Sequence, residues 1–507
     1  MKKKLFFFCC FCFSVNLLSQ TVGITDFMRL NPYSNTNNPA YFIPYDWYVG
    51  VPGLANVNIS FYNTSIFYKN LIKIDSKGIA DDVTINKFLK TIPKNSWLNT
   101  EMGIEVFGFG FRKYNYFFTF ACRLKVDASL KYSKSLFRFL LKDTPLPDNI
   151  EDIDYYSKVN LESNLKIYKE LCFGFQGQIL DNLYIGVRPK ILLGLLDFKT
   201  NAFNAKFSTN VSDDVIAGNY NINLNAASVF PFYKKDSEGN IKIDLGSLFS
   251  TGIGSKKIMN DILTKNIGFA IDLGVVYRIN QEFRVSASIT DLGFIKWKSS
   301  ALKISTDPNA NSFDFSRINA DELLKLLKTG SIDADKNKDF FNGVICSEIN
   351  SYVTMLTSKI MIDGYFDVTP SNRFIIQGKG YILGKNFLPQ LTLAYNGTFY
   401  NAIDVVVSYS MMEKSFANLG IGLGFRMGPA HLYFGTDNVL AAFSKNSKDV
   451  IAPINLFNAS RVDFTVGLLV DFPFKAKVKE PVLKSIFKKK VKKDEDMNEL
   501  VLKSINN

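Results

Sequence analysis

The chain has 507 residues, of which 47% are hydrophobic and 21% charged, and this balance excludes an intrinsically disordered protein. The net charge of +13 includes three lysines at positions 2–4 and a net five in the segment from Lys475 onward, which leaves +5 for the body. Nothing in that remainder predicts nucleic-acid binding. Aromatic residues reach 14%, a content that suits an aromatic-rich soluble sandwich and a membrane barrel equally well.

The N-terminus has the pattern of an export signal, which we place at residues 1–19. Three lysines precede nine apolar residues, Leu5 to Phe13, and polar residues then end the run. The apolar run is too short to cross a bilayer as a helix, which argues against the alternative of a retained anchor. We therefore predict cleavage near Ser19 and Gln20 and an exported mature chain, whose residues 20–52 precede the barrel.

Long period-two runs dominate the rest of the chain. From Tyr114 to Val126, Tyr, Phe, Leu and Val alternate with Asn, Thr, Arg and Lys, so one face of the strand is apolar and the other polar. Comparable strand candidates lie at 56–64, 101–112, 165–178, 183–196, 268–279, 283–290, 355–368, 374–383, 391–399, 403–409, 419–427, 431–436 and 461–472.

Many of these runs have ten to twelve residues, which is the length that a tilted strand needs to cross a bilayer. No second apolar run is suited to a spanning helix, so a membrane-embedded chain would have to close its sheet into a barrel. The sequence thus predicts an all-β fold, an antiparallel transmembrane β-barrel of about fourteen strands over residues 53–474. A large soluble sandwich is the alternative.

Polar segments at 142–160, 200–266 and 299–348 are predicted to be long loops, with a short capped helix at 319–327. Residues 475–507 form a basic tail, which we expect to be exposed in the periplasm. Docking of this tail to an acidic partner or to peptidoglycan is a less favoured alternative.

The residues give little support to an enzyme. The chain has one histidine, His431, which excludes a multi-histidine zinc site and leaves a single place for a Ser-His-Asp triad. Gly252 to Lys256 superficially matches a phosphate loop but lacks its first glycine at the required spacing. We expect no catalytic residue, no metal ligand and no cofactor.

Charged residues on the polar faces of the predicted strands should point into the lumen, because charges facing lipid are costly. One interpretation is that these charges line a pore or a ligand groove. The interpretation that we favour is that they pair with one another in a plugged lumen. The candidate lumen charges are Arg123, Arg188, Lys190, Asp272, Arg278, Arg284 and Arg426.

Asn38, Pro39 and Ala40 lie between the signal and the first strand, and this placement resembles the Asn-Pro-Ala hatch motif of the FadL family of outer-membrane transporters for hydrophobic compounds. The secretion shuttle PorV is similar to the barrels of the superfamily that contains FadL. An uncharacterised family of secreted barrels is a closer match. The stretches that carry this match are 187–192, 271–274, 290–294 and 435–438.

The resemblance implies that Asn38, Pro39 and Ala40 belong to a plug inside the barrel. It implies uptake or binding of hydrophobic small molecules at the bacterial outer membrane. The alternative is a non-transporting interaction protein, a PorV-like partner of a secretion or surface complex. The expected partners are outer-membrane lipid and either a hydrophobic ligand or such a complex. Tyr41 departs from the family pattern, which favours small residues or leucine at that place.

Overall fold

The computed structural model describes residues 23–63, 92–136, 158–210, 215–237, 241–244, 256–307, 312–314, 344–383, 386–412, 415–440 and 461–473, together with residues 90 and 239. The signal at 1–19, the helix predicted at 319–327 and the basic tail at 475–507 lie outside the described residues.

The described strands form one closed antiparallel barrel with fourteen positions around its wall. Ten positions each hold one strand: β3 (Asn95–Lys113), β4 (Tyr116–Ser133), β5 (Lys158–Leu180), β6 (Leu183–Asn210), β17 (Asn372–Leu383), β18 (Asn386–Phe399), β19 (Ile403–Met412), β20 (Ser415–Met427), β21 (Ala430–Thr436) and β22 (Arg461–Pro473).

The other four positions are shared by strands that continue one another in line. These are β1 (Tyr45–Gly50) with β2 (Val57–Asn63), β7 (Val215–Ser228) with β10 (Ile267–Arg278), β11 (Phe283–Trp297) with β12 (Leu302–Thr306) and β13 (Ser312–Asp314), and β14 (Val344–Glu348) with β15 (Tyr352–Met355) and β16 (Ser358–Thr369). Because β22 pairs with both β1 and β2, the sheet closes on itself. The predicted barrel and its strand number are confirmed.

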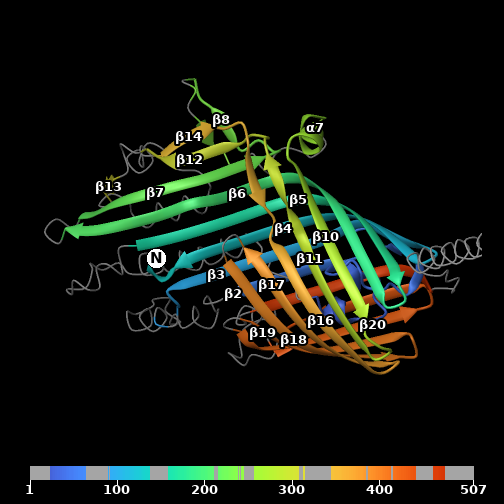
Figure 1. Cartoon of the computed structure of the whole chain (residues 1–507). Coiled ribbons are helices and arrows are strands. Elements are labelled where there is room, and N and C mark those ends of the chain that lie inside the picture. The colour runs from blue at the N-terminus through green and yellow to red at the C-terminus, as the bar shows by residue number, and fades with distance from the viewer. Residues whose placement is uncertain are drawn as a thin grey trace, which may run out of the picture.

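The wall is much taller on one side than on the other. β6 has 28 residues and β5 has 23, whereas β19 has 10, and Figure 1 shows β5, β6 and β7 projecting beyond the other strands. The prediction of a loop throughout 200–266 was wrong, because β6 continues to Asn210 and β7 follows it. The β6 extension lacks regular alternation, whereas in β7 the Asn residues at 219, 221, 223 and 225 alternate with Tyr220, Ile222 and Leu224.

Two small elements lie in the connection from β7 to β10. They are the hairpin of β8 (Tyr233–Lys235) and β9 (Ile241–Ile243), and the helix α7 (Lys256–Thr264). Both lie on the outside of the barrel, near the top of Figure 1. No helix of the described residues is long and apolar enough to cross a membrane.

The outward face of the wall is apolar. On β10, for example, Phe269, Leu273 and Val275 are exposed, while the side chains between them are more buried. Near the short turns the outward face is rich in stacked aromatic pairs, such as Trp47 with Phe472 at a centroid distance of 4.0 Å. An apolar band bordered by aromatic rings is what a lipid bilayer requires of a barrel.

The N-terminal residues 23–44, which we call the plug segment, lie inside the barrel. They contain two 3-10 helices, η1 (Ile24–Phe27) and η2 (Pro32–Thr36), and the second begins where the Asn31 side chain accepts a hydrogen bond from the Tyr33 amide. The main hydrophobic core lies where the plug segment meets the wall, and its members from the plug include Ile24, Phe27 and Met28.

Candidate functional site

The Asn-Pro-Ala motif lies against two paired glycines of the wall. Gly186 of β6 and Gly274 of β10 are direct partners in the ladder. A Cβ added at Gly186 would lie 2.2 Å from the Pro39 carbonyl, and one added at Gly274 would lie 2.1 Å from Asn38 Oδ1. Only glycine permits this approach, so the wall is shaped to receive the motif.

Polar contacts fix the plug segment on this side of the lumen. Asn38 Oδ1 accepts a hydrogen bond from the Ala40 amide at 2.9 Å, which holds the motif in a tight turn. Gln176 Nε2 donates to the Ala40 carbonyl at 3.0 Å, and Ser288 Oγ donates to the Asn37 carbonyl at 2.8 Å. Tyr41, the residue that departs from the family pattern, donates its hydroxyl to the Asp363 carboxylate.

Asp26 lies deeper in the plug segment and is fully buried from solvent. Burial raises its pKa to about 7, although nearby Lys379 and the hydrogen bond from Asn37 Nδ2, 2.7 Å long, both act to lower it. Its other oxygen has no hydrogen-bond partner. A carboxyl that takes up a proton near neutral pH is thus built into the plug.

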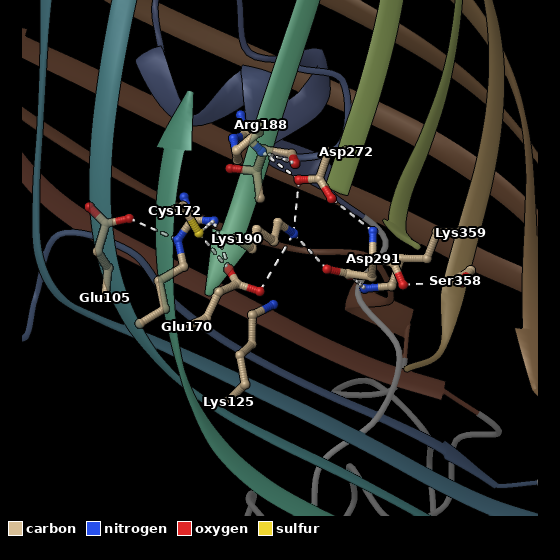
Figure 2. Close-up of polar contacts among 12 residues, drawn as sticks. Glu105, Lys125, Glu170, Cys172, Arg188, Lys190, Asp272, Asp291, Ser358 and Lys359 are labelled. Atoms are coloured by element: carbon tan, nitrogen blue, oxygen red, sulfur yellow. Dashed lines mark hydrogen bonds and ion pairs between the residues drawn. The ribbon is translucent and has the colours of Figure 1, made fainter. Parts of the chain in front are cut away.

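A band of ion pairs crosses seven neighbouring wall positions beside the plug segment (Figure 2). We call this group the ion-pair band, and it consists of five acids and five bases: Glu101, Glu105, Glu170, Asp272, Asp291, Arg123, Lys125, Arg188, Lys190 and Lys359. The formal charges cancel, and each of the ten residues has an oppositely charged partner in the band, as buried charges require.

Lys190 is the centre of the ion-pair band. Its Nζ lies 2.6 Å from Asp291, 2.8 Å from Asp272 and 3.5 Å from Glu170, and only 4% of the side chain is exposed. Asp272 also pairs with Arg188 at 3.3 Å. A lysine that touches acids from three strands ties β5, β10 and β11 together through the lumen.

The ion-pair band is joined to the plug segment. Arg188 donates to the main-chain carbonyls of Asn35 and Thr36 at 2.8 and 2.9 Å. On the other flank, Tyr33 Oη donates to Glu105, which in turn pairs with Arg123 at 3.1 Å. The charges thus contact the plug at two points as well as one another.

The structure brings together four of the seven charges that the sequence placed in the lumen, namely Arg123, Arg188, Lys190 and Asp272. The remaining three lie elsewhere. Arg284 pairs with Asp367 at 2.8 Å, Arg426 pairs with Asp471 at 2.8 Å, and Arg278 is exposed over the Tyr184 ring.

Lys125 lies on the polar face predicted for residues 114–126, so half of the ion-pair band was expected in the lumen. The other half was not: Glu101, Glu105, Glu170, Asp291 and Lys359. Part of the signal was present, since Glu101 and Glu105 alternate with apolar residues along β3. Lys359 lies within the predicted strand 355–368, where it alternates with Ile360 and Ile362, so its signal was present as well. Asp291 lies just after the predicted strand 283–290, at an irregularity with a φ of 58°, and alternation does not reach it. The single histidine, His431, is buried and bonded to Asp471 at 3.1 Å.

A small polar cavity of about 30 Å³ lies between the plug segment and the ion-pair band, large enough for one or two water molecules. Its walls include Thr36 and Asn58, each of which has a buried oxygen without a hydrogen-bond partner. Among the described residues, no group of three or more potential metal ligands occurs. Bound water is the occupant that suits these oxygens.

A second lumenal layer is apolar. Eight buried residues, which we call the lumenal apolar cluster, are Tyr168, Leu192, Ala227, Ala270, Ile295, Trp297, Ala301 and Leu356. The cluster lies where three adjacent wall positions are interrupted, between β7 and β10, between β11 and β12, and between β15 and β16. Trp297 is fully buried there, and its indole N–H donates to Thr354 Oγ1 at 2.8 Å.

Three solved barrels are similar in fold to this chain. The toluene transporter TbuX of Ralstonia pickettii is 8% identical, with 90% of this chain and 100% of that chain covered and a TM-score of 0.40. The toluene transporter TodX of Pseudomonas putida is 6% identical (89% and 97% covered, TM-score 0.37). A FadL homologue of Pseudomonas aeruginosa is 9% identical (88% and 95% covered, TM-score 0.37).

Among curated proteins, none matches this sequence. The model of a family of unknown function, DUF5723, matches residues 39–437, from the Asn-Pro-Ala motif almost to the last strand. The match confirms the resemblance to an uncharacterised barrel family. Since it covers most of the chain, this protein belongs to the DUF5723 family.

Proposed function

We propose that this chain is a bacterial outer-membrane barrel that binds or takes up hydrophobic small molecules, and that residues 23–44 are the plug that controls the path. The observation that carries the proposal is the lumenal apolar cluster. Ion pairs and water would be enough to fill a lumen that binds nothing. Here eight apolar side chains lie next to three strand interruptions, and such a surface offers a site for an apolar ligand.

The arrangement of the lumen supports a gated path. The plug segment and the ion-pair band fill the half of the lumen near the short turns, where Arg112 and Gln176 bond to plug carbonyls. The apolar cluster lies farther toward the long connections. A ligand that reached the cluster would therefore meet the plug next, and release of Asn38 from Gly274 would open the remaining part of the path.

The three tryptophans of the chain allow a direct test. Trp297 is fully buried in the lumenal apolar cluster, whereas Trp47 is 41% exposed on the outward face. In lipid nanodiscs, a brominated alkane dissolved in the bilayer should quench a variant with only Trp47 in proportion to its concentration. A variant with only Trp297 should show saturable quenching, since that indole is reached through a binding site.

Two outcomes of this test would count against the proposal. Trp297 without any quenching would mean that apolar molecules do not enter the lumen. Quenching of both tryptophans with the same linear dependence would mean that the reagent merely dissolves in the membrane. Heat-modifiable gel migration of both variants should first establish that each barrel is folded.

A second candidate function is that of an outer-membrane interaction protein without transport. The projecting wall favours it, since β5, β6 and β7 extend beyond the other strands and offer a sheet surface outside the membrane. A stable complex recovered with the native barrel from outer membranes, together with an unquenched Trp297, would favour this alternative over transport.

A further inference from the structure

The outward face of β11 changes from apolar to basic at one height. Leu292 and Phe294 are 44% and 40% exposed, and the next two residues on the same face are Lys296 and Lys298, both exposed. Among the described residues, neither of these two lysines forms an ion pair.

Neighbouring strands place the apolar limit at the same height. Phe269 of β10 is the ladder partner of Phe294 and is 55% exposed. On the other side, Met355 of β15 pairs with Phe294, and Val353 pairs with Lys296; they are 60% and 49% exposed. A band of large apolar residues across three wall positions thus ends where the lysines begin.

Helix α7 borders this corner from outside the barrel (Figure 1). Its Ile258 and Ile262 are buried against Leu193 and Leu195 of β6. Those leucines alternate with Leu192 and Gly194, and Leu192 belongs to the lumenal apolar cluster, so the leucines face outward. The far side of the helix leaves Met259 and Leu263 exposed by 44% and 55%.

The end of α7 is bonded to the lysine-bearing segment. Asn266 Oδ1 accepts hydrogen bonds from the amides of Lys298 and Ser299 at 2.8 and 2.9 Å. Asp261 of α7 accepts another from Ser299 Oγ at 3.1 Å. These bonds hold the apolar face of the helix and the two lysines, Lys296 and Lys298, in a fixed relation.

From this geometry we infer that the corner of α7 and β11 binds the phosphorylated headgroup of a lipid in the leaflet nearest the long connections. Acyl chains pack against Phe294, Phe269 and Leu263, and the lysine ammonium groups hold the phosphate. The site continues the apolar band of the barrel, and an amphipathic surface helix with adjacent cations is a general device for anionic lipid surfaces. Long connections face the cell exterior in outer-membrane barrels, so the lipid belongs to the outer leaflet.

The inference is tested with lipid A, a diphosphorylated glycolipid, added to the full barrel in a neutral detergent and followed by native mass spectrometry. We expect the wild-type protein to retain lipid A, and K296Q/K298Q to lose roughly 25-fold in affinity, since each cation near an anionic lipid surface contributes about fivefold. The matched control K94Q/K113Q removes two exposed lysines at other places and should bind like the wild type.

A second variant separates the apolar part of the site from its charge. M259S/L263S should weaken retention of lipid A and also of phosphatidylcholine, while the preference for the phosphorylated glycolipid remains. Undiminished binding by K296Q/K298Q, or equal retention of phosphatidylcholine and lipid A by the wild type, would overturn the inference. Displacement of lipid A by millimolar inorganic pyrophosphate would assign the lysines to free phosphate and would contradict a lipid site.

Discussion

The plug segment meets the barrel through two different kinds of surface. Toward β6, β10 and β11 the contacts are directional, since Arg188 and Ser288 donate to plug carbonyls and Asn38 lies against Gly274. Toward β20 and β21 they are apolar. There Ile24 and Met28 pack over Gly422 and Gly435, at which an added Cβ would approach side-chain carbons to 2.7 and 2.5 Å.

This difference indicates what each side does. Hydrogen bonds and ion pairs require one geometry, so the first side sets the position of the plug. Dispersion contacts have no preferred direction, and the far ends of Ile and Met side chains can adjust, so the second side fills space while tolerating small shifts. A plug that moves should therefore release the directional side first, and four measurements examine the contrast.

The largest effect is expected from loss of the cation at the centre of the ion-pair band. Lys190→Met leaves Glu170, Asp272 and Asp291 without their shared partner, and removal of one member of a buried pair costs about 3–5 kcal/mol. Urea unfolding in lipid vesicles should show a loss of this size. Lys131→Met, which breaks an exposed pair with Glu162, should cost at most about 1 kcal/mol. Equal effects would mean that the band contributes no more than a surface pair.

The next effect concerns the glycine beneath the motif. Gly274→Ala would push a methyl group into Asn38, at a cost of about 1–3 kcal/mol for forced overpacking. Hydrogen exchange of a peptide that contains the Ala40 amide should accelerate, since this amide donates to Asn38. The matched control is Gly378→Ala in β17, where the new Cβ would have its nearest neighbour 3.8 Å away. Exchange that is unchanged in both variants would show that the motif does not depend on this contact.

Asp26 should make docking of the plug depend on pH. Its pKa in the folded protein is about 7, above the ordinary 3.8, so the protonated carboxyl contributes stability that is complete below pH 3.8 and is lost as the pH rises through 7. Between pH 6 and 8 the plug should lose about 1 kcal/mol of docking free energy, at 1.36 kcal/mol per unit. Hydrogen exchange of the plug peptide should therefore accelerate between pH 6 and 8 by more than the intrinsic effect of pH on exchange. Asp26→Asn should abolish this additional acceleration. If the additional acceleration persisted in that variant, another titrating group would be responsible for it.

The smallest effect is expected on the apolar side. Gly422→Ala would meet the terminal methyl of Met28 at 2.7 Å and Ile24 Cγ1 at 2.8 Å; the flexible Met28 can move aside, so the cost should lie near the lower end of the range of about 1–3 kcal/mol for overpacking. Exchange of the Ala40 amide should change less than in Gly274→Ala. If Gly422→Ala loosened the motif more than Gly274→Ala did, the assignment of the two sides would have to be reversed.

The barrel was predictable from the sequence because it depends on a local pattern. Period-two alternation in β4, β10 and β22 decides which side chains face lipid, and a bilayer permits only a closed sheet. The same pattern identified Arg123, Arg188, Lys190 and Asp272 as inward-facing. The prediction failed in the extension of β6, which lacks regular alternation, and in β7, whose four alternating Asn residues from Asn219 to Asn225 made the segment polar enough to predict a loop.

Tertiary structure alone decided which charges meet and where the plug rests. Lys190 touches acids from three other strands, and Lys359 pairs with Glu101 at 2.6 Å across 258 residues of sequence. Such pairings depend on the closure and stagger of the barrel, which no local spacing encodes. The sequence by itself determined that a barrel forms and which face of each strand is polar. The distances across the lumen, set by fourteen strands closing on one another around an N-terminal segment, decided that these polar faces pair and hold the plug.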